Sequence, residues 1–266
     1  NNPDQAPMLT NTGFDSLVTD LPTDFPLRVN LCLTDRIEES QSSEYQELST
    51  EQWKFLIRKT FDAGIPQVIF FGGEPTLRSD LLELLRYTEE LGMVSGLISA
   101  SPHIYQDQNT LDAFLDSGLD HLIIEFDPKK GEDASQLKRI FDQDLFTCVR
   151  FPVYDRSDLY SWAIGLVDAG ANALSFYPVE LEAYDETAHL NQQLSNKAIV
   201  IEHDLPYPVQ PASMRQQIRL FSPEISENEA TFYTILPDGS LIQQDSPMHL
   251  LGNLISAGWR ELVVKE

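Results

Sequence analysis

A tight turn after an apolar segment contains the residue types best suited to hold a ligand. The segment 67–71 has the length and composition of a buried strand, and Gly72-Gly73-Glu74-Pro75 follows it directly. Two glycines at a strand end allow backbone conformations closed to other residues and leave space for a ligand to approach the main chain. We therefore expect either a ligand-binding turn or a turn that the fold needs without any ligand.

Three carboxylates, Glu74, Glu125 and Asp127, are expected at strand ends. In parallel sheets the carboxyl ends of the strands meet at one edge, which is where ligands bind. Clustered acids there could act as a general acid and base if burial raised the pKa of one of them. The alternative is structural, because acids in such places also cap helices or pair with a cation such as Arg150.

The remaining chemically active residue types show no pattern typical of a site. Two cysteines, Cys32 and Cys148, are too few for a disulfide framework, and we expect both to be packing residues in strands. The five histidines lack metal-ligand spacing. The sequence contains no P-loop and no Gly-x-Ser-x-Gly motif. We therefore predict no metal site.

The composition indicates an acidic globular protein. Of the 266 residues 42% are hydrophobic, which is enough for a sizeable core. The net charge of −24 argues against binding to nucleic acid or to an anionic membrane surface. It indicates either a solubilising surface or a face for a basic partner. The sequence has no apolar run of membrane-spanning length and no signal-peptide pattern at its start, so we expect a cytoplasmic protein.

Strands and helices are expected to alternate through most of the chain. Ser49 and Gln52 have the spacing of a capping box, and Ser79 and Asp158 are expected to cap two later helices. The inner face of the first helix is expected to consist of Trp53, Leu56, Ile57, Thr60 and Phe61. The six expected strands span residues 27–33, 67–71, 93–99, 121–126, 146–153 and 173–177. Such alternation requires parallel pairing, in a doubly wound sheet or a barrel. No Gly-x-Gly-x-x-Gly follows the first strand, which disfavours a dinucleotide-binding fold.

The C-terminal third has a different pattern. Residues 181–230 are acidic and rich in Gln, Asn and Pro, with one helix expected at about 185–196. Two apolar segments flank Pro237-Asp238-Gly239-Ser240, which predicts a β-hairpin. A last turn of helix is expected within 250–264.

With these elements placed, the sequence resembles the radical S-adenosylmethionine (SAM) superfamily. It is most similar to the peptide- and cofactor-maturing branch, which carries a SPASM/twitch-type extension. The resemblance covers roughly 26–180 and, more weakly, 231–260. The segments that carry it are Leu33-Thr34, Phe71-Gly72-Gly73-Glu74-Pro75-Thr76 with 77–81, Ile98-Ser99-Ala100-Ser101, Glu125-Phe126-Asp127, and Asp238-Gly239 with Leu251-Gly252-Asn253-Leu254.

The resemblance implies an α/β fold with three parts. Residues 1–26 are expected to be an irregular lead-in. Residues 27–180 are expected to form a partial (β/α)6 TIM-like barrel of the radical SAM type. Residues 181–266 are expected to form a small α+β extension, a degenerate form of the SPASM/twitch unit.

One departure from the family pattern bears on function. The three cysteines of the family's cluster loop would fall on Ile37, Gln41 and Glu44, and Gln244 stands where the extension would carry another. A [4Fe–4S] cluster is held by soft thiolates, and none of these residues supplies one. We therefore expect a degenerate member with no [4Fe–4S] cluster and no reductive cleavage of SAM.

The resemblance also implies a vestigial SAM pocket. In the family, the Gly-Gly-Glu turn meets the amino group of SAM, and this contact could persist here. Without the cluster's open iron, much of the anchoring of SAM is lost. The charge of Glu125 would repel the SAM carboxylate or attract its sulfonium. SAM binding is left open, and no other cofactor is expected. The implied pocket residues are Gly72, Gly73, Glu74, Pro75, Ser99 and Glu125.

Three functions fit these observations. The leading hypothesis is a pseudoenzyme that acts as a binding or accessory subunit for a peptide or a protein, such as an active enzyme of the same pathway or a larger complex. The second is an enzyme that binds SAM or another small ligand at the barrel mouth without radical chemistry. The third is a purely structural subunit. Neither nucleic acid nor a membrane is expected as a partner.

Overall fold

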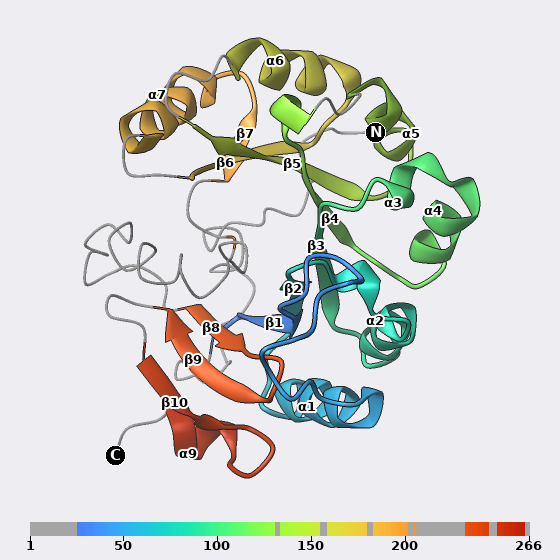
Figure 1. Cartoon of the computed structure of the whole chain (residues 1–266), viewed down its shortest axis with the longest axis vertical. Coiled ribbons are helices and arrows are strands. Elements are labelled where there is room, and N and C mark those ends of the chain that lie inside the picture. The colour runs from blue at the N-terminus through green and yellow to red at the C-terminus, as the bar shows by residue number, and fades with distance from the viewer. Residues whose placement is uncertain are drawn as a thin grey trace.

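The computed structural model describes residues 26–130, 134–154, 159–179, 183–201, 205, 232–244 and 249–263. Within these ranges ten strands form one sheet in the order β10-β9-β8-β1-β2-β3-β4-β5-β6-β7 (Figure 1). The strands β1 to β7 are all parallel to their neighbours. Their bounds are β1 Arg28–Thr34, β2 Gln67–Gly72, β3 Val94–Ser99, β4 His121–Glu125, β5 Phe146–Val153, β6 Ala173–Pro178 and β7 Ile199–Ile201.

Helices connect successive strands and lie along the convex side of the curved sheet (Figure 1). The α-helices among these connections are α1 Thr50–Asp62, α2 Leu81–Glu90, α3 His103–Gln106, α4 Gln108–Leu115, α5 Lys138–Phe141, α6 Tyr160–Ala169 and α7 Tyr184–Leu194. The 3-10 helices are η1 Pro75–Leu77, η2 Pro128–Lys130 and η3 Ala134–Leu137. This pattern confirms an α/β fold built on a parallel sheet, while the (β/α)6 form of the barrel stays a prediction.

The sheet separates two apolar regions, because successive side chains of a strand point to opposite faces. On β1, Leu31 and Leu33 join the large core beneath the helices. Cys32, between them, joins a smaller cluster on the inner face with Ile123 and Cys148. The inner face therefore holds every second residue of each strand, and this alternation decides which strand-end residues lie inside the curve.

Local sequence signals explain where the first helices begin. At α1, Ser49 Oγ accepts a hydrogen bond from Gln52 N at 3.4 Å, and Gln52 Oε1 accepts one from Ser49 N at 3.0 Å, so the capping box is confirmed. Phe61 is 38% exposed, so its expected place on the inner face is wrong. It lies one residue beyond Thr60, about 100° further round the helix than the centre of the buried face.

Two other expected caps differ from the prediction or lie outside the described residues. The residue before α2 is Asp80, not Ser79, and its side chain caps no helix N–H because it is bonded to other groups. The expected cap Asp158 lies outside the described residues. Helix α6 begins at Tyr160, and Trp162 on this helix is 40% exposed.

The C-terminal strands lengthen the sheet beyond β1. Strands β8 Phe232–Ile235 and β9 Ser240–Gln244 form the expected antiparallel hairpin. Strand β8 also pairs parallel to β1, which sequence reasoning missed. Part of the expected last helix is instead the strand β10 His249–Asn253, and the helix itself is α9 Trp259–Val263.

Hydrogen bonds attach the C-terminal segment, both the hairpin turn and the residues after β10, to the first crossover. Lys59 Nζ donates to the carbonyl oxygens of Leu254 and Ala257, each at 2.7 Å. Leu48 N donates to Pro237 O at 2.8 Å. Strands from the expected extension thus continue the sheet, and the domain boundary near residue 180 stays a prediction. Within the described ranges, none of the helices combines the length and apolar character needed to span a bilayer.

Candidate functional site

The glycines after β2 are required by a close approach of the chain after β1. Gly73 N donates to Thr34 O at 2.8 Å, and Glu74 N donates to Arg36 O at 2.7 Å. A Cβ on Gly72 would lie 2.2 Å from Thr34 O, and one on Gly73 would lie 2.1 Å from Arg36 O. Gly72 also has a φ of +152°. The two glycines therefore have a structural role that needs no ligand.

The carboxylate of Glu74 is bonded to donors of the chain itself. Its Oε1 accepts from Thr76 N at 3.0 Å, from Thr76 Oγ1 at 2.6 Å and from Ser99 Oγ at 2.8 Å. Its Oε2 accepts from Ala100 N at 2.9 Å. The residue is 8% exposed. A ligand amino group would have to compete with donors that are already in place.

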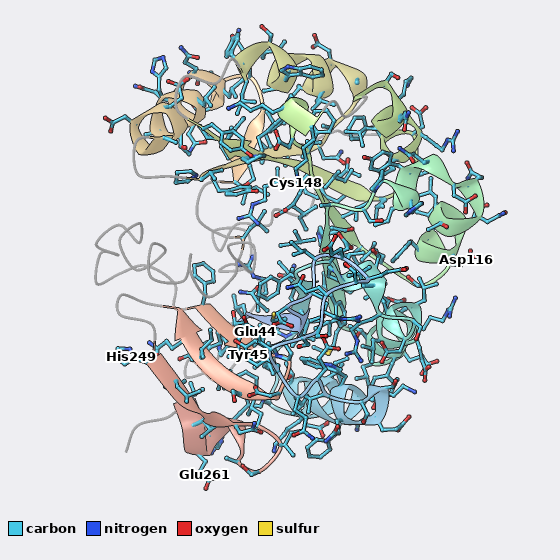
Figure 2. The ribbon with its side chains drawn as sticks, viewed as in Figure 1. Glu44, Tyr45, Asp116, Cys148, His249 and Glu261 are labelled. Atoms are coloured by element: carbon cyan, nitrogen blue, oxygen red, sulfur yellow. The ribbon has the colours of Figure 1, made fainter. Side chains whose placement is uncertain are left out.

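The loop at the expected cluster positions is closed by its own hydrogen bonds. Gln41 Oε1 accepts from Ile37 N at 2.8 Å, so the Gln41 side chain turns back onto the loop. Asp35 accepts from Ser43 Oγ at 2.5 Å and from Glu44 N at 2.9 Å. Figure 2 shows Glu44 and Tyr45 together on this loop and Cys148 apart from them on β5.

These residues do not fit a [4Fe–4S] cluster. Ile37 is 56% exposed and has no ligating atom, and neither Gln41 nor Glu44 offers a thiolate. Cys32 and Cys148 are buried on strands, as expected for packing residues, and burial raises the pKa of the Cys148 thiol to about 12. In the described ranges no group of three His, Cys, Asp or Glu side chains is placed to hold a metal ion. The side chain of Gln244 lies outside the described residues.

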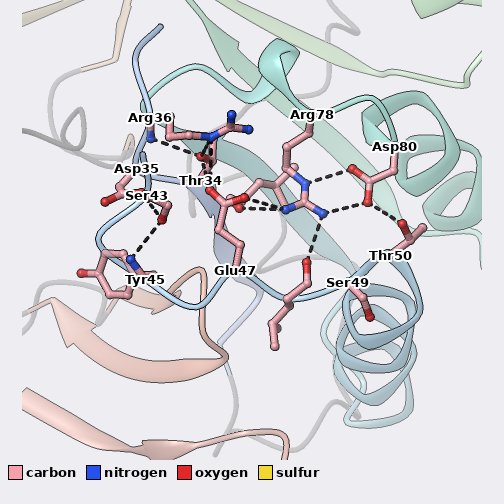
Figure 3. Close-up of polar contacts among 12 residues, drawn as sticks. Thr34, Asp35, Arg36, Ser43, Tyr45, Glu47, Ser49, Thr50, Arg78 and Asp80 are labelled. Atoms are coloured by element: carbon pink, nitrogen blue, oxygen red, sulfur yellow. Dashed lines mark hydrogen bonds and ion pairs between the residues drawn. The ribbon is translucent and has the colours of Figure 1, made fainter. Parts of the chain in front are cut away.

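Arg78 holds the end of this loop in place (Figure 3). Its guanidinium donates to Asp80 at 2.9 and 2.7 Å, to Leu48 O at 3.2 Å and to Glu47 at 3.4 Å. Glu47 in turn accepts a hydrogen bond from the Thr34 hydroxyl. Burial raises the pKa of Asp80, but hydrogen bonds from Arg78 and Thr50 outweigh this and hold it below its ordinary value. Sequence reasoning missed this network, because its members come from four separate segments.

Another ion pair joins Glu125, the last residue of β4, to its register partner Arg150 within β5. Arg150 Nη1 donates to Glu125 Oε1 at 3.4 Å, which confirms the expected pairing of an acid with Arg150. The guanidinium carbon lies 4.5 Å from the centre of the Tyr177 ring. Burial, and next to it the charge of Glu125, raise the pKa of Tyr177 above its ordinary range.

Asp127 has a separate set of donors. It accepts from Lys129 N at 3.0 Å and from Tyr154 OH at 3.0 Å, and the Lys129 ammonium lies 3.8 Å from the Tyr154 ring centre. Each of the three expected carboxylates thus has its own set of donors. These donors come from residues close to it in sequence or from the neighbouring strand and the residues that follow it. We call this edge the rim, defined by Glu74, Ser99, Glu125, Asp127, Arg150 and Tyr177.

A surface groove of about 410 Å³ lies elsewhere, on the outer helical layer. It includes the exposed face of Trp162 and a row of small residues of α6, and its lining residues are Ser135, Ser161, Trp162, Gly165, Leu166 and Ala169. Because α6 covers the convex side of the sheet, this groove does not open onto the rim.

Comparisons with known proteins show what this chain is similar to. No model of a known protein family matches the chain. The PqqA peptide cyclases of Rhodopseudomonas palustris and Bradyrhizobium diazoefficiens are 38% identical over 94 residues and 34% identical over 101 residues. These stretches are 35% and 38% of this chain. These relatives support the expected resemblance to the radical SAM superfamily.

Two solved structures share the fold of this chain. Streptococcus suis SuiB bound to S-adenosylmethionine superposes with a TM-score of 0.57 at 15% identity, over 82% of this chain and 60% of SuiB. SuiB bound to the precursor peptide SuiA gives a TM-score of 0.56 at 14% identity, over 82% of this chain and 59% of SuiB. The chain matches only about a quarter, 24% and 25%, of the two curated peptide cyclases.

Replacement of Gly73 by alanine tests the close approach at the turn. A Cβ there meets the Arg36 carbonyl, so we expect Gly73→Ala to lower the free energy of unfolding by about 2–4 kcal/mol. Gly165→Ala is the matched control, because a Cβ on Gly165 has nothing within 4 Å and the site is helical. It should be neutral or stabilising by up to about 1 kcal/mol in urea denaturation. Equal effects of the two changes would contradict the role assigned to Gly73.

Proposed function

We propose that the chain is a radical-SAM-like pseudoenzyme that acts as a binding or accessory subunit for a peptide or a partner protein. It works without a [4Fe–4S] cluster and without radical cleavage of SAM. The proposal rests mainly on the hydrogen bonding of the Glu74 carboxylate. Four hydrogen bonds from Thr76, Ser99 and Ala100 engage the carboxylate that the family resemblance assigns to SAM.

The loop after β1 supports the same proposal. The resemblance implies that, in the superfamily, this loop carries the thiolates that bind the cluster. Here Arg78, Glu47 and Asp35 hold the loop instead, through hydrogen bonds and ion pairs. A loop that is organised by polar contacts does not need a metal to keep its shape, and no thiolate is present on it to bind one.

The relatives and the charge support a peptide or protein partner. The curated relatives are named as peptide cyclases, and SuiB was solved with a precursor peptide. The net charge of −24 would attract a partner with basic segments over a distance of about 10 Å. We place the binding surface at the rim of a partial (β/α)6 barrel and the protein in the cytoplasm.

Anaerobic reconstitution with iron and sulfide tests the absence of a cluster. We expect the wild-type chain to bind no stoichiometric iron and acid-labile sulfide, because it lacks the three thiolates. The triple variant Ile37→Cys, Gln41→Cys, Glu44→Cys is the matched control, since it restores thiols at the family spacing. A wild-type chain with the visible absorbance of a cluster and matching iron and sulfide content would overturn this part of the proposal.

Selection of random displayed peptides on the immobilised chain tests the partner. We expect enriched peptides to carry lysine or arginine, to bind more weakly as salt rises, and to protect backbone amides of the rim from hydrogen exchange. The change Asp112→Lys, on the outer helix α4, should leave the affinity within about twofold. Protection confined to the outer helices, or no enrichment at all, would contradict rim binding.

A second candidate function is a non-radical enzyme that binds SAM or another small ligand. It is favoured by one observation, the retained Gly72-Gly73-Glu74 turn beside Ser99. Titration with SAM in a calorimeter separates the two candidates. We expect no saturable binding, because the Glu74 carboxylate is already bonded. Saturable binding that Glu74→Gln weakens at least about tenfold would favour the second candidate.

A further inference from the structure

Two polar side chains on the inner face of the sheet are buried without a hydrogen bond. Asn30 on β1 and Thr234 on β8 are each 1% exposed. Neither Asn30 Oδ1 nor Thr234 Oγ1 has a hydrogen-bond partner among the described residues. Buried polar atoms in proteins are nearly always paired, with protein or with a bound molecule, because an unpaired one destabilises the fold. Two such atoms side by side therefore point to a group that binds between them.

The register of the strands places these two side chains next to each other. Asn30 pairs with Thr234 on one side and with Ile69 on the other. Ile69 belongs to the inner apolar cluster, so all three side chains point to the inner face. Neighbouring strands lie about 4.8 Å apart, so one small group can reach both Asn30 Oδ1 and Thr234 Oγ1.

The pair lies toward the other end of the strands from the rim. The inner-face residues in register with it form one layer, which consists of Thr234, Asn30, Ile69, Gly96, His121 and Phe146. His121 and Phe146 are the first residues of β4 and β5, whereas the rim lies toward the carboxyl ends of the strands. The pair is therefore separate from the pocket that the family resemblance implies.

The charges around this layer favour an uncharged occupant. None of its six residues is acidic, so a bound cation would have no counter-ion there. Arg28, the preceding inner-face residue of β1, adds a positive charge. Burial lowers the pKa of His121, and the charge of Arg28 lowers it further, so this imidazole is mainly uncharged at pH 7. An anion would be repelled by the amide oxygen of Asn30.

We propose that Asn30 and Thr234 form a binding site for an uncharged group that carries two hydrogen-bond donors on one atom. One hydrogen is donated to Asn30 Oδ1 and the other to Thr234 Oγ1, so both buried oxygens gain a partner. A water molecule and the NH₂ group of a small primary amide share this chemistry. The bound group joins β1 to β8, and the site requires neither a cluster, nor SAM, nor the partner proposed above.

The change Thr234→Val tests the site, because it removes the hydroxyl and keeps the shape of the side chain. A buried hydroxyl that stays unpaired destabilises the fold, so without a bound group its removal would raise the Tm or leave it unchanged. A bound donor reverses the sign, because the variant leaves that donor without one of its acceptors. We expect the Tm of Thr234→Val to lie about 2–4 °C below that of the wild type.

Crystal structures of the wild-type chain and two variants test for the bound group directly. We expect electron density within about 3.2 Å of both Asn30 Oδ1 and Thr234 Oγ1 in the wild type. Thr234→Ser keeps the hydroxyl and should keep this density, whereas Thr234→Val should lose it. A direct hydrogen bond between Asn30 and Thr234, with no density between them, would overturn the proposal.

Acetamide separates the two sources of the donor, with N,N-dimethylacetamide as its control because that molecule has the same carbonyl group and no N–H. An amide as the occupant predicts density for several atoms and a wild-type Tm that rises saturably with acetamide alone. A water molecule as the occupant predicts density for one atom and the same response to both compounds. The proposal is overturned if the wild type shows no density bonded to both oxygens, or if the Tm of Thr234→Val equals or exceeds that of the wild type.

Discussion

The close approach of the chain after β1 to the turn after β2 is the contact on which the rim depends. Two backbone hydrogen bonds join these segments, and no side chain larger than hydrogen fits at Gly72 or Gly73. The approach fixes the position of Glu74, which caps η1. It therefore also fixes where the Glu74 carboxylate meets Ser99, at the end of β3, and the following Ala100. It also fixes the start of the loop that Arg78 closes. The turn therefore keeps its form with no ligand in it.

Carboxylates along this edge join neighbouring strands. Glu74 connects β2 to β3, and Glu125 connects β4 to β5. Burial of a charged carboxylate destabilises the fold unless hydrogen-bond donors replace the lost water. Both sets of contacts compensate this loss of hydration. A ligand at Glu74 would have to displace donors of the chain itself.

Much of the fold follows from local pattern, and the strands and pairings that sequence reasoning missed have weak local signals or none. The capping box of Ser49, the parallel strands and the hairpin all have short-range signals. Strand β7 has only three residues, and β10 follows β9 with an irregular register. Neither segment has enough alternation of apolar and polar residues to be recognised as a strand. The parallel pairing of β8 with β1 joins residues about 200 positions apart, and no local pattern specifies such a contact.

The identity of the residues at the expected cluster positions is determined by the sequence alone. Ligation of iron–sulfur clusters depends on the identity of atoms, and Ile37, Gln41 and Glu44 carry no thiol in any conformation. Which groups form hydrogen bonds or ion pairs with the carboxylates of the rim is decided only by the tertiary structure. Whether Glu74 faces a ligand or its own chain depends on Ser99 and Ala100, which a separate strand brings to it. The pairing of Glu125 with Arg150 depends likewise on the register of two strands. A residue's chemistry is contained in its identity, whereas its partners are set by packing over the whole sheet.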